Sequence, residues 1–536
     1  MSERAFRIAA AGLVLLALLP QFLSRTIPDT AWLLHVADRV AGGARLYVDL
    51  VDVNPPLVVW LDLPIVLAAR WLGVSDLLLY RVAVSALVLG SVMASGRLLR
   101  RLLLDEPPAR LRVALLAMLF VTLTLSREDF GEREHLMLAL VLPYVMLTAI
   151  RLRGAAVPSG TVAAVGLAAG LGIALKPYFV ALWLAMEACL LLRQRRAYRP
   201  RPEALAVVAV GAVYLAAVAR WSPEYFDVVR LMAGPYYTFL SNSLPVTALL
   251  GDGAAIPLAA LLCWVALRRD AERPDLWAVL AFATFGLYLS AVLQHKGWRY
   301  HFYPSMATGL LLLGLMPTHL RRPVRGLAAR LYAYAATGVT AVVAGWTAVA
   351  CIVQIGDPLH PRYDADPDLS RLVPVVRERA GERGILVLSW SMASTFPLVT
   401  YSGTRSVSRF NHLWIPAAVY HEGIYAEPPL RYRERSAMGA LERYVNDAVV
   451  EDFAQGRPGL LLVLRPAPDR RRWGLRRLDF LAYFGRDPRF AALFARYRYS
   501  GTIGEYWLFE RLPEDAPDEP PRGGRSETST TDKERS

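Results

Sequence analysis

The sequence contains very little lysine. Among its 60 basic residues, lysine occurs only as Lys176, Lys296 and Lys533, and every other basic residue is arginine. The arginine bias itself reflects composition and carries no mechanism. Lys176 and Lys296, however, each lie beside long apolar runs, where a lone cation is costly unless it has a partner or a task.

Cysteine is also scarce. The three cysteines, Cys189, Cys263 and Cys351, lie in apolar runs without pairing or metal-ligand spacing, which is typical of small buried residues. The chain has no P-loop, no dinucleotide-binding glycine fingerprint, no HExxH and no paired CxxC motif. Nucleotide-loop and zinc-hydrolase functions therefore have no support in the sequence.

Apolar residues, by contrast, are abundant. They make up 55% of the 536 residues, and the mean hydropathy is +0.33, which is rare for soluble domains of this length. The net charge of +14 comes largely from arginine clusters in short loops between apolar runs, the positive-inside pattern of membrane proteins. We therefore expect a polytopic protein of the lipid bilayer, with no nucleic-acid partner.

The apolar runs and the positive-inside rule together predict about eleven transmembrane helices. With this number the N-terminus is cytoplasmic, the C-terminus is extracytoplasmic, and each arginine-rich loop lies on the same side. The expected spans are 6–23, 79–99, 111–126, 135–150, 161–175, 178–193, 204–220, 247–267, 275–293, 302–318 and 330–354.

The first outer loop, residues 24–76, is unusually long. It contains two amphipathic stretches, Thr30–Ala41 and Pro56–Gly73, which we expect to be interfacial helices. The second stretch could span the membrane by hydropathy alone. Counting it as a span would place the arginine clusters outside, so the interfacial interpretation is favoured.

The composition divides the chain into three parts. Residues 1–355 form the predicted transmembrane domain, residues 356–513 an extracytoplasmic α/β domain, and residues 514–536 a tail of disordered composition. In the second part, 384–390 and 459–466 are strand-like, 367–380 and 437–454 are helix-like, and 497–511 resembles a hairpin.

Acidic residues at the outer membrane boundary are the first candidates for chemistry. Asp29 lies just after the first span, where a carboxylate could accept a proton from an acceptor hydroxyl. It is equally suited to cap a helix N-terminus. In 127–138, "REDFGEREHLML", Glu132 and Glu134 could face a polar cavity or bind a divalent cation, although an acidic start to a helix explains them as well.

Basic and aromatic residues at the same boundary are the second set. Lys176 interrupts a long apolar run and is a candidate for binding an anion, or for a lysine at a tight turn whose ammonium reaches the headgroups. The stretch 294–304, "QHKGWRYHFYP", supplies a cluster suited to phosphate: His295, Lys296, Arg299 and His301. Such a stretch is also typical of an aromatic belt with basic residues at headgroup level.

Aromatic side chains are candidates for lining a substrate groove. Trp298 and Tyr300 belong to the basic stretch, and Tyr236 lies in the aromatic segment 221–245, which we interpret as an outer loop. Tyr47 lies in the first outer loop, between the two amphipathic stretches.

The layout of the chain resembles a known family. An acid just outside the first span is followed by two interfacial helices around "ADRVAGGARLYVDLVDVNPPLVVWL" (37–61), a multispan bundle and a C-terminal outer domain. This is similar to the C-type glycosyltransferase superfamily, near the protein O-mannosyltransferases and the aminoarabinose transferases of lipid A. Those enzymes use polyprenyl-phosphate sugars as donors.

The resemblance implies a membrane glycosyltransferase of the bacterial inner membrane that inverts the anomeric carbon. It implies Asp29 as the catalytic acid of the first outer loop and Glu132 or Glu134 as the acid of the second. The aminoarabinose branch has KPP where this chain has Asn54–Pro56, so the phosphate-binding cation must come from elsewhere. Lys296, Arg299 and Lys176 are the candidates.

The implied partners are a polyprenyl-phosphate-linked sugar and an extracytoplasmic glycan, lipid or protein acceptor. No cofactor is certain, and a divalent cation, Mg²⁺ or Mn²⁺, remains open. A flippase or exporter of lipid-linked glycan is the main alternative function. An enzyme that transfers whole glycans from a polyprenyl-diphosphate carrier would need more cationic charge in its outer loops than this chain has.

Overall fold

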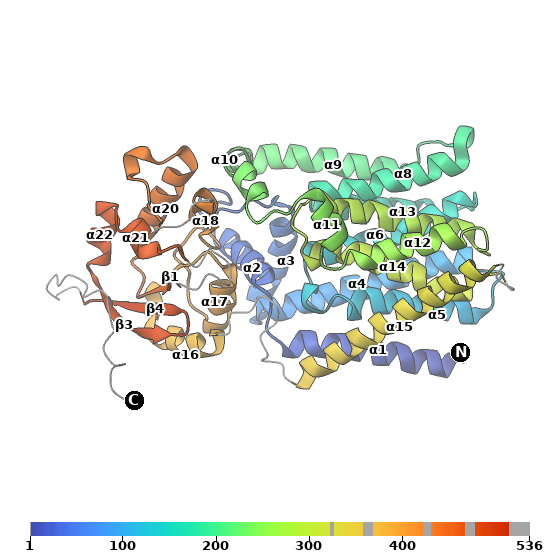
Figure 1. The fold of residues 1–536 in the computed structure, drawn as a ribbon, viewed down its shortest axis with the longest axis horizontal. Helices are drawn as coiled ribbons and strands as arrows, with labels where there is room; N and C mark the ends of the chain where they lie inside the picture. The colour runs from blue at the N-terminus through green and yellow to red at the C-terminus, as the bar shows by residue number, and fades with distance from the viewer. Residues whose placement is uncertain (1, 322–325, 357–367, 422–429, 467–476, 514–536) are drawn as a thin grey trace, which may run out of the picture.

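The computed structural model describes residues 2–321, 326–356, 368–421, 430–466 and 477–513. A helical bundle occupies one end of the long axis and a small sheet with its helices occupies the other (Figure 1). The predicted tail, 514–536, lies outside the described residues.

The bundle contains a helix for each of the eleven predicted spans. These helices are α1 (Glu3–Leu23), α4 (Asp76–Leu102), α5 (Pro108–Leu119), α6 (Arg133–Leu152), α7 (Ser159–Ala174), α8 (Val180–Gln194), α9 (Pro202–Trp221), the pair α11 (Leu244–Leu250) and α12 (Ala255–Leu267), α13 (Pro274–Val292), α14 (Arg299–Leu315) and α15 (Leu327–Gly356). In the described residues, six of them are long and apolar enough to cross a membrane, or seven with the pair α11 and α12. The count of eleven spans remains a prediction.

Two of the sequence-based expectations need correction. The run 247–267 is not one helix, because α11 and α12 meet at 76° across a break that contains Gly251 and Gly253. A side chain at Gly253, whose φ is +97°, would meet the sulfur of Met306 at 2.3 Å. The segment 221–245, interpreted as a loop, forms helix α10 (Glu224–Thr238).

Helices α6 and α14 lie at the centre of the bundle, and nearly all their residues are buried. The glycines of α7 permit close packing against the neighbouring helices. A Cβ added at Gly172 would lie 2.9 Å from Cβ of Leu140 in α6, and one at Gly166 would lie 2.9 Å from Cβ of Ala206 in α9. Close packing on both sides therefore fixes α7 between α6 and α9.

The first amphipathic stretch forms α2 (Pro28–Ala41) and the second forms α3 (Leu57–Leu72), so both predicted helices are confirmed. Pro28 occupies the first turn of α2, where its missing N–H is not needed. Gly73 ends α3 in the left-handed region at φ 67°. These local signals place Asp29 in the first turn of α2, next to the bundle.

Residues 368–513 contain a four-stranded sheet in the order β1-β2-β4-β3. The strands are β1 (Ile385–Leu388), β2 (Leu460–Leu464), β3 (Tyr497–Ile503) and β4 (Tyr506–Arg511), which confirms the predicted strands and hairpin. β1 and β2 are parallel, whereas β4 is antiparallel to both β2 and β3. The accompanying helices are α16 (Leu369–Arg379), α17 (Phe396–Ser402), α18 (Trp414–Val419), α20 (Ala440–Gly456), α21 (Phe480–Phe484) and α22 (Pro488–Phe494).

Helix α17 joins this second part of the chain to α2. The fully buried ring of Phe396 lies 4.6 Å from the ring of Trp32 and 5.1 Å from that of His35. The backbone N–H of Thr26 donates to the Tyr401 hydroxyl at 2.6 Å, and the N–H of Val51 donates to the carbonyl of Arg409 at 2.7 Å. Both ends of the segment that carries Asp29 are thus held by the C-terminal part.

Candidate functional site

Buried charged residues gather where α6 begins. We use the name Glu134 cluster for Asp29, Glu132, Arg133, Glu134, Lys176 and His301, which come from α2, α6, α14 and the junction of α7 and α8. Glu134 is fully buried, and Glu132, Arg133, Lys176 and His301 are between 3% and 7% exposed. Such dense burial of charge is costly and requires mutual compensation.

The turn before α6 fixes its first residues. Gly131 has φ +85°, and its backbone N–H donates to Nδ1 of His135 at 2.9 Å. The other ring nitrogen of His135 lies 2.7 Å from the carbonyl oxygen of Thr122. His135 therefore holds the turn, while Glu132 occupies the N-cap position and Glu134 the first turn.

Glu134 is the acceptor at the centre of the cluster. Lys176 donates through Nζ to its Oε1 at 2.5 Å, and Nε2 of His301 lies 3.9 Å from the same oxygen. Oε2 of Glu134, Oε2 of Glu132 and Nδ1 of His301 have no hydrogen-bond partner in the described part of the chain. Buried polar atoms of this kind are uncommon in native proteins, and each calls for an explanation such as a water, an ion or a ligand.

Arg133 connects the cluster to Asp29 and to the NPP motif. One guanidinium nitrogen lies 3.9 Å from a carboxylate oxygen of Asp29, and another donates to the side-chain oxygen of Asn54. Asn54 is oriented in turn by Asp52, which accepts from its side-chain amide at 2.7 Å and from its backbone N–H at 2.9 Å. Asn54, the position that departs from KPP, thus contacts an arginine from the first turn of α6.

Two aromatic rings lie between the two described lysines. Nζ of Lys176 is 5.3 Å from the ring centre of Tyr300, and Nζ of Lys296 is 5.8 Å from that of Trp298. The two rings are 5.8 Å apart. Lys176 and Lys296 therefore flank one aromatic surface, although 120 positions separate them in the sequence.

Three basic residues of 294–304, namely His295, Lys296 and Arg299, have hydrogen-bond or ionic partners outside the Glu134 cluster. Lys296 donates to the carbonyl oxygens of Tyr236, at 2.8 Å, and Phe239, at the end of α10. Arg299 pairs with Asp129 and, at 3.2 Å, with Glu128. The ring of His295, a residue with φ +57°, lies 3.2 Å from the carbonyl of Asn242. Arg299 and His295 are thus held by neighbours outside the Glu134 cluster.

The remaining aromatic candidates border the same region. The ring centre of Tyr236, in α10, lies 5.0 Å from Nζ of Lys296 and 5.4 Å from the ring centre of Trp414. Tyr47 has φ +72° and donates its hydroxyl to the carbonyl of Asn54 at 2.7 Å. Tyr236 therefore lies beside the aromatic surface, and Tyr47 supports the loop that holds Asn54.

Burial shifts the acid–base behaviour of the loop residues. Desolvation raises the pKa of Glu132 well above its usual value, and the negative charge of Asp29 adds to the effect. Burial lowers the pKa of Lys176, and the positive charge of Arg133 lowers it further. Burial alone lowers the pKa of Lys296 to about 8. Burial therefore favours the neutral acid at Glu132 and works against the charge on both lysines.

The divalent cation that the sequence left open remains a prediction. Within the described ranges, no three or more His, Cys, Asp or Glu side chains are arranged to hold a metal ion. The carboxylates of the Glu134 cluster are instead accompanied by Lys176 and Arg133.

Sequence reasoning missed Arg133, Asn54 and Asp52 as site residues. Arg133 was only one of several ionisable residues in 127–135, and nothing local distinguishes it. Its contact with Asn54 spans 79 positions. The sequence nevertheless contains one indication. Asn54 stands where the resembled branch has a lysine, so a cation from another part of the chain was to be expected beside it.

Three solved structures are similar to this chain to different degrees. ArnT from Cupriavidus metallidurans bound to undecaprenyl phosphate is 13% identical and aligns with 97% of this chain and 100% of its own, with a TM-score of 0.58. The apo state of ArnT gives a TM-score of 0.53 at 13% identity, over 93% of this chain and 97% of its own. The arabinofuranosyltransferase AftD from Mycobacteria has a TM-score of 0.42 at 14% identity, and the match covers 96% of this chain and 40% of AftD.

The sequence matches no family model, and no curated protein is significantly similar to it. The apolar helices and the shared fold define a multi-pass membrane protein. Its particular fold is that of ArnT, so the resemblance to the C-type glycosyltransferase superfamily is confirmed at the level of the fold.

Proposed function

We propose that the chain is a membrane glycosyltransferase that transfers a sugar from a polyprenyl-phosphate donor to an extracytoplasmic acceptor, which is a glycan, a lipid or a protein. In this proposal the Glu134 cluster faces the outside of the bacterial inner membrane, the N-terminus is cytoplasmic, and the sheet-containing part is extracytoplasmic. The fold shared with a structure bound to undecaprenyl phosphate supports a donor of that lipid class.

One observation carries the proposal: a buried arginine lies between the NPP motif and the acid of α2. Arg133 is 3% exposed, contacts Asn54 and lies 3.9 Å from Asp29. Its Nε has no hydrogen-bond partner within the described residues. A guanidinium held in this way can donate two parallel hydrogen bonds to a phosphate. Arg133 thereby supplies the cation that Asn54 lacks.

The reaction needs a base and stabilisation of a leaving phosphate. The carboxylate of Asp29, whose side chain is 31% exposed, takes the proton of the acceptor hydroxyl. The acceptor oxygen forms a bond to the anomeric carbon from the opposite face as the bond from that carbon to the phosphate oxygen breaks. The polyprenyl phosphate leaves with that bond's electron pair, and the anomeric configuration inverts.

Arg133 and Lys176 stabilise the charge that develops on the leaving phosphate. Glu134 holds Lys176 in place through the 2.5 Å hydrogen bond, and His301 lies on the other side of that carboxylate. Tyr300 and Trp298 offer an aromatic surface between Lys176 and Lys296 for the sugar or the isoprene units. Lys296 fixes the end of α10 and, with it, Tyr236.

The direct test is transfer of labelled sugar in membranes that contain the full-length protein. A panel of radiolabelled polyprenyl-phosphate hexoses and pentoses serves as donor, and both labelled product and released polyprenyl phosphate are measured. Asp29→Asn is expected to reduce transfer by roughly 100-fold or more, the usual contribution of general base catalysis.

Asp38→Asn is the matched control, because Asp38 lies on the same helix but is 46% exposed and pairs with Arg70. It should transfer sugar at the wild-type rate. Undiminished transfer by Asp29→Asn would remove Asp29 as the base. Movement of lipid-linked sugar across the membrane without any transfer, in wild type as well, would favour a flippase.

A further inference from the structure

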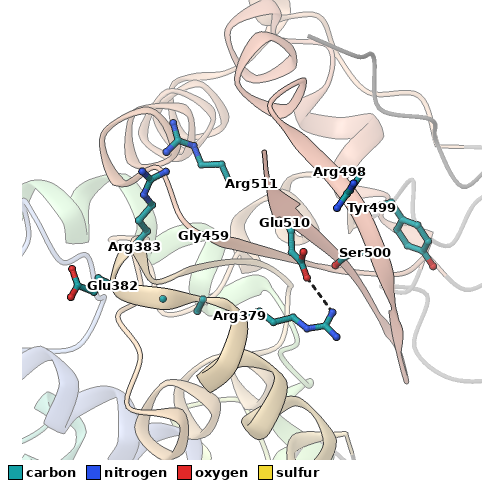
Figure 2. Close-up of a pocket in the computed structure, with 11 residues that line it drawn as sticks. Arg379, Glu382, Arg383, Gly459, Arg498, Tyr499, Ser500, Glu510 and Arg511 are labelled. Atoms are coloured by element: carbon teal, nitrogen blue, oxygen red, sulfur yellow. Dashed lines mark hydrogen bonds and ion pairs between the residues drawn. The ribbon is translucent and has the colours of Figure 1, made fainter. Parts of the chain in front are cut away.

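A wide polar groove of about 870 Å³ lies in the C-terminal part of the chain, separate from the Glu134 cluster. Figure 2 shows the groove between the end of α16 and the β3–β4 hairpin. Its lining residues are Arg379, Ala380, Gly381, Glu382, Arg383, Gly459, Arg498, Tyr499, Ser500, Glu510 and Arg511. The size is within the range of roughly 300–1,000 Å³ that small-ligand sites occupy.

The floor of the groove is rigid because backbones meet there closely. The N–H of Gly459 donates to the carbonyl of Gly384 at 3.0 Å, and the N–H of Arg511 donates to the carbonyl of Gly459 at 3.1 Å. A Cβ at Gly459 would lie 2.3 Å from the carbonyl oxygen of Ala380. The groove therefore lies at one end of the sheet, where β1, β2 and β3 begin and β4 ends, and its side chains project from fixed positions.

Basic residues outnumber acidic residues in the lining of the groove. It has four arginines, Arg379, Arg383, Arg498 and Arg511, but only two carboxylates, Glu382 and Glu510. Glu510 pairs with Arg379 at 3.1 Å and lies opposite Arg498 in the β3–β4 register. The Arg498 guanidinium is exposed and has no hydrogen bond or ion pair to a described residue.

The chemistry of this lining selects anions. Guanidinium groups bind carboxylates and phosphates through paired hydrogen bonds, and several of them in one concave surface attract a multivalent ligand. Tyr499 is 40% exposed, and its ring lies 5.7 Å from that of Phe509 on one side. Figure 1 places β3 and β4 on the far side of α17 from the bundle, so the groove lies away from the lipid-facing helices.

We propose that this groove binds an anionic glycan, with carboxylate or phosphate groups, as a second contact for the acceptor. The proposal rests on the proposed function for the choice of a glycan, because the acceptor of a glycosyltransferase must be held during transfer. A long acidic acceptor would occupy the groove with one segment while its reacting hydroxyl lies at Asp29.

Equilibrium binding to the full-length protein in detergent tests the proposal without any turnover. The probes are a tetramer of galacturonate, a glycerol-phosphate oligomer and a neutral maltotetraose. The acidic oligomers should bind at least about tenfold more tightly than the neutral one, and their affinity should fall with added salt. The stronger of the two acidic probes then distinguishes carboxylate from phosphate as the recognised group.

Arg498→Ala should weaken binding of the acidic probe by about tenfold, the loss of one paired contact. Arg431→Ala removes an exposed arginine of the same part of the chain outside the groove, and it should leave binding unchanged. Equal affinity of Arg498→Ala and wild type would overturn the assignment. If inorganic phosphate binds with the same affinity as the oligomers, the groove is a general anion site, and the assignment to an anionic glycan is overturned as well.

The acidic residues that follow β4 in the sequence need a control of their own: Glu514, Asp515, Asp518 and Glu519. A full-length variant with these four residues changed to Gln or Asn should still bind the acidic probe, as wild type does. Binding that occurs only in this variant would assign the groove to the chain's own acidic segment and overturn the proposal.

Kinetics separates this inference from the proposed function. With an acidic acceptor, Arg498→Ala should raise KM about tenfold and leave kcat unchanged, whereas Asp29→Asn should lower kcat. Probe binding by a chain that transfers no sugar would refute the glycosyltransferase proposal alone. Transfer that proceeds without binding at the groove would refute the second contact alone.

Discussion

The two ends of helix α6 both carry buried charge, yet the charges are compensated differently. At the Arg151 end, Arg151 binds Glu203 through two hydrogen bonds of 2.8 and 3.0 Å, and Glu187 accepts from Arg201 and from the hydroxyls of Tyr198 and Tyr144. Among the described members of this group, only Nε of Arg201 is buried without a hydrogen-bond partner. This end resembles a finished structural network.

At the other end, the Glu134 cluster leaves Oε2 of Glu132, Nε of Arg133, Oε2 of Glu134 and Nδ1 of His301 without partners in the described part of the chain. Burial of charge alone therefore does not mark a site. Completed pairs stabilise the fold, whereas unsatisfied buried groups cost stability and are retained where a ligand completes them. The predictions below test this distinction from both ends of the helix.

The largest effect is expected at Arg133. Arg133→Gln removes the charge beside Asp29 and Asn54, so kcat/KM for sugar transfer should fall by roughly 100- to 1,000-fold, as when one donor to a developing anion is lost. Steady-state transfer from the labelled donor measures the change. Arg193→Gln, at an exposed pair with Asp275, is the control and should keep wild-type activity.

The second effect is on stability, at the opposite end. Arg151→Met removes the bidentate partner of the fully buried Glu203, which keeps Arg201 at 3.5 Å, so the cost should be below the roughly 3–5 kcal/mol of breaking an isolated buried pair. The free energy of unfolding, from denaturant titration in detergent, should fall accordingly. Activity per folded molecule should stay at the wild-type level. An Arg151→Met variant that folds normally but transfers no sugar would show that the Arg151 end is needed for activity as well.

The sequence allowed some residues of the Glu134 cluster to be predicted but not others. Glu132, Glu134 and Lys176 were predicted as site candidates because charge next to membrane-spanning runs is locally conspicuous. Their convergence follows from the packing of α6, α7 and α14, which only the structure gives. Arg133 was missed because its role depends on Asn54, a residue from a different loop.

Lys296 illustrates the opposite case. The sequence suggested a phosphate ligand, whereas the structure places its ammonium on two carbonyls of α10. Helix α10 was itself interpreted as a loop, since its aromatic residues and Pro235 obscure the helical pattern. The acceptor groups for Lys296 could not be anticipated while the helix that carries them was unknown. The fold was more predictable, because apolar runs and turn residues are local signals.

The third effect is expected at Asn54. Asn54→Ala removes the acceptor that orients Arg133, so the KM for the polyprenyl-phosphate donor should rise about tenfold, equivalent to about 1.4 kcal/mol. The value of kcat should change much less, because the guanidinium itself is still present. Donor titration at saturating acceptor separates the two constants. An equal fall in kcat would place Asn54 in the chemical step.

The smallest effect is a pH dependence at Lys296. Its folded pKa, about 8, lies below the ordinary value of 10.5, so the unfolded chain binds more protons between these limits. Stability from this group therefore rises with pH through that window. Activity should instead fall a few-fold above pH 8, as the ammonium that holds α10 loses its charge. Lys296→Arg should move the decline to higher pH, and an unchanged profile would exclude Lys296 as its cause.

The most direct test of the account is binding of undecaprenyl phosphate to the purified full-length protein, measured by native mass spectrometry for wild type, Arg133→Gln and Arg151→Met. We expect wild type and Arg151→Met to bind the lipid with equal affinity, and Arg133→Gln to bind it at least about tenfold more weakly. Equal binding by Arg133→Gln and wild type, with Arg151→Met folded, would contradict the assignment of the Glu134 cluster as the phosphate site.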